Sequence, residues 1–382
     1  MSVTAAAGFR AGGVAAGLKS AGRDVAVVVN DGPRRCAAGV LTTNRVKAAP
    51  VLWTQQVLRA GAVRAVVLNS GGANACTGPA GFQDTHATAE RAAAALGIGA
   101  VEVAVCSTGL IGQRLDLAAL LPGVDAAVAG LTDDGGAAAA EAIRTTDTVR
   151  KQAMVRGSGW TAGGMAKGAG MLAPALATML AVITTDAALE PAEADACLRQ
   201  AVGRTFERLD ADGCLSTNDT VLLLASGASG VPVGAAEFGA ALTGLCADLA
   251  GQLLADAEGA TKQVRIQVCS AATEDDAVQV ARAVARNSLL KCALYGSDPN
   301  WGRVLAAVGT TRAAFEPDRL AVTMNGVRVC AHGAAAAQRE AVDLSGRDVE
   351  ITIDLDAGTE QATVWTTDLS VAYVHENSAY ST

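Results

Sequence analysis

Aromatic residues are scarce in this sequence of 382 residues: Phe, Trp and Tyr together make up 3% of it, whereas apolar residues of all kinds make up 51%. Ala and Gly are prominent instead, so the sequence predicts a core built mainly from small aliphatic side chains. The length allows two or three domains and a large core.

An excess of positive charge is also absent, because 38 acidic residues outnumber 30 basic ones and the net charge is −8. Proteins that bind nucleic acids or anionic membranes usually present a basic surface. The charge balance therefore favours a small-molecule substrate over either of these partners.

The nine cysteines are scattered singly, and no pair has the spacing of a zinc site or a redox CxxC motif. Their odd number argues against a closed disulfide framework, so reduced thiols in a cytosolic protein are expected. No cluster of His, Cys and Asp residues has metal-ligand spacing, and no metal is expected.

Continuous hydrophobic runs of the kind found in targeting segments are missing too. Arg10 interrupts the N-terminal apolar stretch, which argues against a signal peptide. The uncharged stretch between Lys167 and Asp186 is long enough to suggest a membrane span, but it contains Pro174 and glycines. We expect a soluble cytoplasmic protein.

Alternating β and α patterns predict an α+β fold of layered mixed β-sheets, covered by helices, in at least two lobes. Expected strands are Val25–Val29, Gly39–Thr43, Ala65–Leu68, Val101–Cys106, the run from Thr178 to Thr184, Thr220–Ala225, Val264–Cys269, Val349–Leu355 and Thr363–Trp365. Expected helices are Asp84–Leu96, Leu115–Leu121, Ala137–Arg144, Pro191–Leu209, Ala236–Glu258 and Asp275–Ala285. Asn325-Gly326 between two apolar runs predicts a hairpin with a type I′ turn.

Thr178 is the most informative single residue, because it separates a Gly-, Ala- and Pro-rich approach from an apolar strand pattern. A hydroxyl at this position can attack the preceding carbonyl and split the chain. The freed Thr then supplies both nucleophile and base, since its own α-amine can take the hydroxyl proton. The three histidines lie in no nucleophile motif. From spacing alone, a buried Thr at the start of a core strand is the commoner explanation.

The segment from Lys167 to Leu180, KGAGMLAPALATML, resembles the self-cleavage segment of the ornithine acetyltransferase (glutamate N-acetyltransferase) family of arginine biosynthesis. Further landmarks of that family follow its order along the whole chain. They are Gly8–Arg10, Thr42–Arg45, Asn69–Gly78, Cys106–Gly112, Thr145–Thr148, Ser216–Thr220, Asp256–Lys262, Asp298–Arg303 and Asn377–Thr382.

The resemblance implies a self-processing DmpA/ArgJ-like fold and a cut between Ala177 and Thr178. The products would be an α part of residues 1–177 and a β part of residues 178–382, held together in an α2β2 heterotetramer. Thr178 would take acetyl from N2-acetyl-L-ornithine and pass it to L-glutamate by a ping-pong mechanism through an acetyl-threonyl ester. Some family members also use acetyl-CoA as a co-substrate, and no motif separates the two kinds. No cofactor is implied.

The resemblance also assigns roles to individual residues. Thr108 and Gly109 would form the oxyanion hole, and the residues that contact substrate would be Thr145, Lys167, Thr178, Glu258, Asn377 and Thr382. An ammonium such as that of Lys167 suits a substrate carboxylate, and Glu258, expected at the C-terminal end of a helix, suits the amine of ornithine. Ser216–Asp219 and Asp298–Arg303 are expected to support the pocket from behind.

Each of these positions has a simpler structural explanation. Thr108-Gly109 could be a plain strand-to-loop turn, Lys167 a solvated loop lysine and Thr145 a helix-end cap. Without the resemblance, the last residues would be a disordered tail.

Two positions depart from the family pattern: Gly72 stands where Asn is usual, and Cys214-Leu215 stands where Asp-Thr is usual. We expect neither to touch the assigned positions. The alternatives are a self-processed N-terminal-nucleophile hydrolase related to aminopeptidases, in which water replaces glutamate, and a non-catalytic scaffold that never cuts itself.

Overall fold

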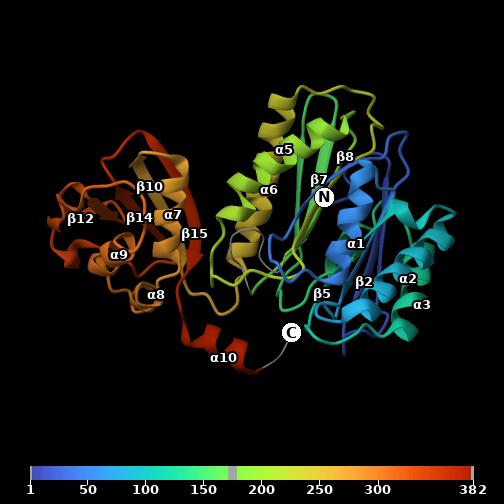
Figure 1. Ribbon diagram of the computed structural model, residues 1–382, viewed down its shortest axis with the longest axis horizontal. Coiled ribbons are helices and arrows are strands. Elements are labelled where there is room, and N and C mark those ends of the chain that lie inside the picture. The colour runs from blue at the N-terminus through green and yellow to red at the C-terminus, as the bar shows by residue number, and fades with distance from the viewer. Residues whose placement is uncertain (1, 171–178, 380–382) are drawn as a thin grey trace.

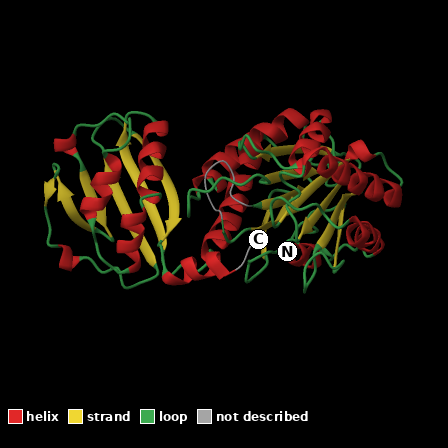
Figure 2. Ribbon diagram, turned by 60° about the horizontal axis from the view of Figure 1, so that its bottom comes forward, coloured by secondary structure: helices red, strands yellow, loops and turns green. Residues whose placement is uncertain are grey.

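The computed structural model describes residues 2–170 and 179–379 and has two lobes of unequal size (Figure 1). The larger lobe holds two β-sheets and the smaller lobe one, with helices covering each sheet (Figure 2). The α+β class with layered mixed sheets is confirmed.

The first sheet of the larger lobe has the strand order β1-β2-β4-β5. Its strands are β1 (Phe9–Val14), β2 (Val25–Asn30), β4 (Ala65–Ser70) and β5 (Val103–Thr108). Helices that pack with these strands are α1 (Ala49–Val57), α2 (Gly78–Leu96), α3 (Leu117–Ala129) and α4 (Gly136–Ala142).

The second sheet has the order β3-β9-β8-β7-β6. Its strands are β3 (Cys36–Leu41), β6 (Lys151–Arg156), β7 (Thr161–Lys167), β8 (Leu180–Thr185) and β9 (Thr220–Ala225), and its helices are α5 (Pro191–Arg204) and α6 (Ala235–Ala255). β7 and β8 pair antiparallel, whereas β8 and β9 pair parallel. The expected cut after residue 177 therefore falls between two paired strands of one sheet.

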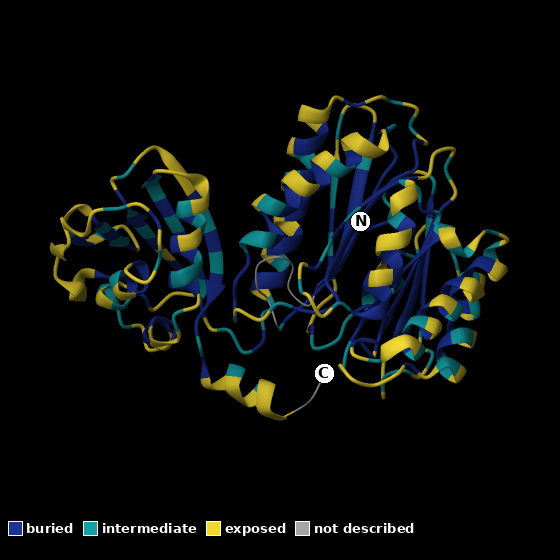
Figure 3. Ribbon diagram, viewed as in Figure 1, coloured by how far each residue is buried: buried dark blue, intermediate teal, exposed yellow. Residues whose placement is uncertain are grey.

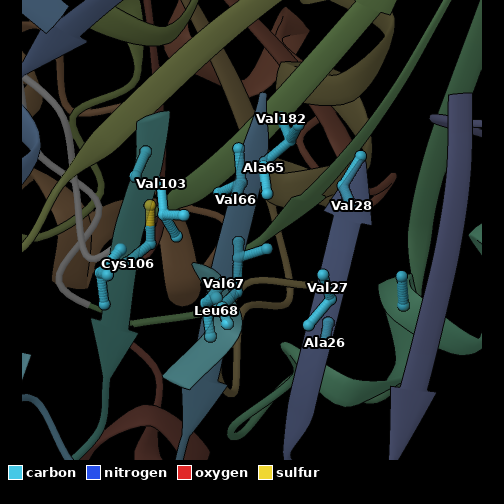
Figure 4. Close-up of a cluster of buried hydrophobic side chains, with 14 of the residues drawn as sticks. Ala26, Val27, Val28, Ala65, Val66, Val67, Leu68, Val103, Cys106 and Val182 are labelled. Atoms are coloured by element: carbon cyan, nitrogen blue, oxygen red, sulfur yellow. The ribbon is translucent and has the colours of Figure 1, made fainter. Parts of the chain in front are cut away.

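Small side chains join the two sheets face to face. Val182 of β8 lies beside Ala65 and Val66 of β4 in one apolar cluster (Figure 4), which Leu180 and Leu222 also join. The other face of the second sheet, with Ala181 and Ile183, packs under α5 and α6. The valine- and alanine-rich composition fits this arrangement, because both faces of these strands are buried.

The smaller lobe is a six-stranded sheet in the order β13-β12-β11-β14-β10-β15. Its strands are β10 (Gln263–Ala271), β11 (Ala321–Met324), β12 (Val327–Ala331), β13 (Ala334–Ala335), β14 (Asp348–Asp354) and β15 (Glu360–Thr367). Its helices are α7 (Glu274–Ala285), α8 (Ser288–Tyr295) and α9 (Trp301–Val308). The predicted Asn325-Gly326 hairpin is confirmed, with positive φ angles of 42° and 82° at its two central residues.

The C-terminal segment leaves the smaller lobe as helix α10 (Val371–Ala379), which has no buried residue and extends below the two lobes (Figures 1 and 3). The segment before it is anchored, because Asp368 accepts the backbone N–H groups of Thr261 (2.9 Å) and Lys262 (3.0 Å). The simple expectation of a disordered tail concerned residues 377–382, and the part of it that the structure describes, 377–379, is helical.

Several helix ends differ from the sequence predictions. α5 ends at Arg204 and a 3-10 turn, Phe206–Arg208, follows it. α3 continues to Ala129 although Pro122 lies inside it. α6 ends at Ala255, so Glu258 lies beyond the helix and its expected position at the helix end is wrong.

α6 is also the one helix of the described ranges whose length and hydropathy would suit a membrane span. Its apolar side, which includes Phe238, Leu242 and Leu249, packs in the same cluster as β8 and α5. This is the packing of a core helix, and half of the apolar stretch is buried within the protein.

Candidate active site

Strand ends from both sheets of the larger lobe meet at one place. Lys167, Leu180 and Thr220 lie side by side at the ends of β7, β8 and β9. The last residue of β5, Thr108, lies against this row, because Lys167 Nζ donates a hydrogen bond to Thr108 Oγ1 at 3.2 Å. The sequence-predicted residues Thr108 and Lys167 are thus brought together.

The predicted nucleophile Thr178 and its neighbour Ala177 lie outside the described residues. The next residue, Met179, is held firmly at the start of β8. Its N–H donates to Asp219 Oδ1 at 3.0 Å, and its carbonyl accepts from the N–H of Thr220 at 3.1 Å. Met179 is therefore fixed beside the row of strand ends.

Thr108 and Gly109 form a turn that fits only glycine at the second position. Gly109 has a φ of +134°, and a Cβ atom there would lie 2.5 Å from the backbone nitrogen of Gly72. Gly72 N donates to the Thr108 carbonyl at 3.0 Å. The expectation that Gly72 does not touch the assigned positions is wrong, because it packs directly against both.

Buried amide and hydroxyl groups brace this turn. Asn218 Nδ2 donates to the carbonyls of Ser107 (2.8 Å) and Ala73 (2.6 Å), and Ser107 Oγ donates to Asn69 Oδ1 at 2.6 Å. Asn218 belongs to the Ser216–Asp219 segment, so this part of the sequence does support the Thr108-Gly109 turn from behind, as expected.

Lys167 is 1% exposed and is the last residue of a core strand, so the simple explanation of a solvated lysine is wrong. Burial lowers the pKa of its ammonium group, and the nearby carboxylate of Asp147 opposes that shift. A buried cation at this point can pair with a substrate carboxylate without competition from water.

A second buried lysine and two aspartates lie behind Lys167, and sequence reasoning did not single them out. Lys151 Nζ donates to Asp147 Oδ1 and to Asp256 Oδ2, at 2.5 Å in both cases. Although burial raises the pKa of Asp147, the charges of Lys167 and Lys151 and the N–H of Gly168 lower it to about 2 overall. Both aspartates lie in segments that carry the family resemblance, Thr145–Thr148 and Asp256–Lys262, and this was the only sequence signal that could have pointed to them.

Glu258 reaches the same place from a segment far along the chain, just after α6. Its carboxylate Oε1 accepts from Thr146 Oγ1 at 2.5 Å, and its N–H donates to the carbonyl of Ala169 at 3.0 Å. Thr145, the neighbour of Thr146, donates its N–H to Asp147 Oδ2 at 3.0 Å. Thr145, Lys167 and Glu258 therefore belong to one cluster of interacting segments.

Asp219 is a further carboxyl group at this end of the sheet, one residue before β9. It is fully buried, and burial raises its pKa well above the ordinary value, despite the N–H of Met179. Its Oδ1 accepts the N–H of Met179, so this buried carboxyl group holds the residue that follows Thr178.

Comparison with known proteins shows the family to which the chain belongs. The ArgJ family model matches residues 10–382. The arginine biosynthesis bifunctional protein ArgJ of Thermobifida fusca is 66% identical over 383 residues, and ArgJ 1 of Streptomyces clavuligerus is 65% identical over 382 residues; in both cases the match covers 100% of each chain. This chain belongs to the ArgJ family.

A solved structure of ornithine acetyltransferase from Mycobacterium tuberculosis, in complex with ornithine, is 64% identical in sequence. The match covers 45% of this chain and 94% of that chain, with a TM-score of 0.45.

Two of the residues that the ArgJ-family resemblance assigns to substrate lie on the tail. Thr382 is outside the described residues. Asn377 is exposed on α10, and its Nδ2 donates to the Tyr373 carbonyl of the same helix at 3.0 Å. No described contact brings Asn377 to Lys167 or Thr108, so its role stays a prediction.

Asp298–Arg303 does not support the pocket through any described contact. Trp301 and Arg303 begin α9 of the smaller lobe, and Arg303 Nη1 donates to the Leu289 carbonyl at 2.5 Å. Asn300 caps the helix. The segment leads into the start of α9 in the smaller lobe, and its support of the pocket stays a prediction.

Gly170 provides a test of the position of Glu258. A Cβ atom on Gly170 would lie 2.5 Å from Glu258 Oε2, so Gly170→Ala should push the carboxylate away from its present position. We expect the KM for an ornithine substrate to rise about tenfold, which corresponds to about 1.4 kcal/mol of binding free energy. Steady-state kinetics would measure this change.

Gly244→Ala is the matched control, because a Cβ atom at Gly244 in α6 meets no atom within 4 Å. An unchanged KM in Gly170→Ala, with the control also unchanged, would show that the Glu258 carboxylate does not contact the substrate.

Proposed function

We propose that this protein is a self-cleaving acetyltransferase of arginine biosynthesis, which moves acetyl from N2-acetyl-L-ornithine to L-glutamate through an acetyl-Thr178 ester. The match to ArgJ proteins over the whole chain supports the reaction class. The observation that supports the site is the contact of Lys167 Nζ with Thr108 Oγ1, close to Met179, the residue that follows Thr178 in the chain.

In the proposed maturation, Thr178 Oγ attacks the carbonyl carbon of Ala177, and the Ala177–Thr178 amide becomes an ester as the C–N bond breaks. Water then hydrolyses the ester and leaves Thr178 with a free α-amine. Residues 1–177 contribute β3, β6 and β7 to the second sheet and residues 178–382 contribute β8 and β9. Hydrogen bonding between β7 and β8 would keep the two parts together after the cut.

In the proposed transfer, the α-amine takes the proton of Thr178 Oγ as this oxygen attacks the acetyl carbonyl of N-acetylornithine. Thr108 Oγ1 and the N–H of Gly109 would donate hydrogen bonds to the tetrahedral oxygen. Ornithine leaves with the proton, and the amine of glutamate then attacks the acetyl-Thr178 ester in the reverse sense. Lys167 would pair with a substrate carboxylate and Glu258 with the side-chain amine of ornithine.

The curated relatives are described as bifunctional, and acetyl-CoA is proposed as a second acetyl donor for glutamate. We also propose the cytoplasm as the location and an α2β2 heterotetramer as the assembly, both from the family resemblance.

The test is the rate of ornithine release from N-acetylornithine, measured with and without glutamate. We expect a stoichiometric burst without glutamate and continuous turnover with it, together with formation of N-acetylglutamate. Equal continuous rates in both conditions, with release of acetate, would establish the hydrolase instead. The same assay with acetyl-CoA as donor decides whether the protein has the second activity.

A further inference from the structure

A fully buried ammonium group lies behind the candidate site, at the first residue of β6. Lys151 is 0% exposed, and its Nζ lies 2.5 Å from Asp147 Oδ1 and 2.5 Å from Asp256 Oδ2. A charge is costly to bury unless it is paired, and the removal of one partner leaves the other charge uncompensated. This ion triad is therefore a fixed element of the fold, not a loose surface contact.

Each of the two carboxylates also holds backbone from another segment. Asp147 accepts the N–H of Gly168 at 2.7 Å, and Gly168 directly follows Lys167. Asp256 accepts the N–H of Thr148 at 2.9 Å and lies two residues before Glu258. The ammonium of Lys151 is thus linked to Lys167 through one aspartate and to Glu258 through the other.

These contacts join residues 145–151, 167–169 and 256–258, which we name the Lys151 cluster. Two further hydrogen bonds complete it, from Thr146 Oγ1 to Glu258 and from the Glu258 N–H to Ala169. Two of the three segments precede the proposed cut and the third follows it. The cluster consequently fixes groups of the α part against groups of the β part.

We propose that Lys151 is a positioning residue of the acetyl-transfer site: its ammonium, bound between Asp147 and Asp256, sets Lys167 and Glu258 at the separation that the two charged ends of the substrate require. This inference rests on the proposed function. Lys151 itself touches no reacting atom in this account and acts through the two aspartates.

The pH dependence of activity distinguishes a positioning role of Lys151 from a purely structural one. Burial lowers the pKa of Lys167 most strongly; Asp147, Asp219 and Glu258 raise it, and the charge of Lys151 lowers it. Removal of the Lys151 charge should therefore raise the pKa of Lys167. If Lys167 binds substrate as a cation, activity is lost as pH rises through that pKa, and the loss should occur at higher pH without Lys151.

The experiment compares the pH dependence of kcat/KM for N-acetylornithine in the wild type, Lys151→Met and Lys151→Arg. For Lys151→Met we expect kcat/KM to fall at least about tenfold, mainly through KM. The alkaline limb of the pH profile, where activity is lost as pH rises, should move up by about 0.5–1 pH unit. Lys151→Arg keeps the charge, so its limb should stay at the wild-type position.

Lys262→Met is the matched control for the loss of a buried lysine. The ammonium of Lys262 donates to the carbonyls of Leu344 (2.6 Å) and Gly346 (2.8 Å) in the smaller lobe. Both Met variants should lower thermal stability, but the alkaline limb should move only in Lys151→Met. A limb at the wild-type pH in Lys151→Met, or an equal shift in Lys262→Met, would overturn the inference.

If Lys151→Met does not fold, Asp256→Asn tests the proposal from the other side of the triad. This variant keeps the Lys151 charge and its bond to Asp147 but weakens the link to Glu258. We expect KM to rise several-fold while the alkaline limb stays in place, and an unchanged KM would overturn the inference. Acetylation of Thr178 in the wild type is measured in parallel, because its absence would refute the proposed function rather than the role of Lys151.

Discussion

Thr178→Ala should abolish both the chain cut and acetyl transfer, since it removes the oxygen that forms the ester in each reaction. We expect a single intact chain of 382 residues and no acetylated product. Denaturing electrophoresis and an acetyl-transfer assay would measure the two effects. Loss of a nucleophile that acts in a covalent mechanism typically lowers turnover by several orders of magnitude.

Thr178→Ser is the control for this prediction, because it keeps the hydroxyl and removes only a methyl group. It should retain part of both activities. Because the cut creates the α-amine that serves as base, the two activities should fall together across such variants. A Thr178→Ala protein that still splits at this bond would show that another group performs the cut.

Gly109→Ala should have the second-largest effect. A Cβ atom at this residue would approach the Gly72 nitrogen to 2.5 Å and the Gly71 carbonyl carbon to 2.9 Å, and the φ of +134° disfavours any side chain. The backbone must shift, and the N–H of Gly109 would leave its position as an oxyanion donor. Loss of one such donor typically costs about 2.7–4 kcal/mol, so we expect kcat to fall about 100-fold or more.

Gly112→Ala provides the comparison, because Gly112 lies in the same loop with a φ of +89° and its Cβ would meet no atom within 4 Å. This variant should carry a similar backbone penalty but leave the Gly72 contact intact. If both variants lose the same fraction of kcat, the loss arises from strain in the loop and Gly109 is not an oxyanion donor.

The sequence predicted local features well where one short segment carries the signal. The Asn325-Gly326 hairpin is present, and the Ser216–Asp219 segment lies behind Thr108 as expected. The family resemblance assigned Thr108 and Lys167 to one site, and the structure places their side chains in contact. These successes depend on turn chemistry and on recognised motifs, both of which can be read from a few neighbouring residues.

Other features depend on contacts between distant segments, and no periodicity reveals them. Lys151 and Asp256 are 105 residues apart in sequence, and only the folded chain shows that they form an ion pair. Gly72 is 36 residues from Thr108 in sequence, and only the parallel pairing of β4 with β5 brings the two residues into contact. The end of α6 was also misplaced: the helix ends at Ala255, and Asp256, the residue after it, binds Lys151 and Thr148 through its carboxylate.

The central claim is that Thr178 cuts the chain and then carries the acetyl group. The most direct test is the intact mass of the purified protein under denaturing conditions, with and without N-acetylornithine. We predict two pieces that meet at Ala177 and Thr178, and the mass of one acetyl group added to the piece that begins with Thr178 only when the substrate is present. A single uncut chain that gains no acetyl group would contradict the account, and Thr178 would then be a core threonine without a catalytic role.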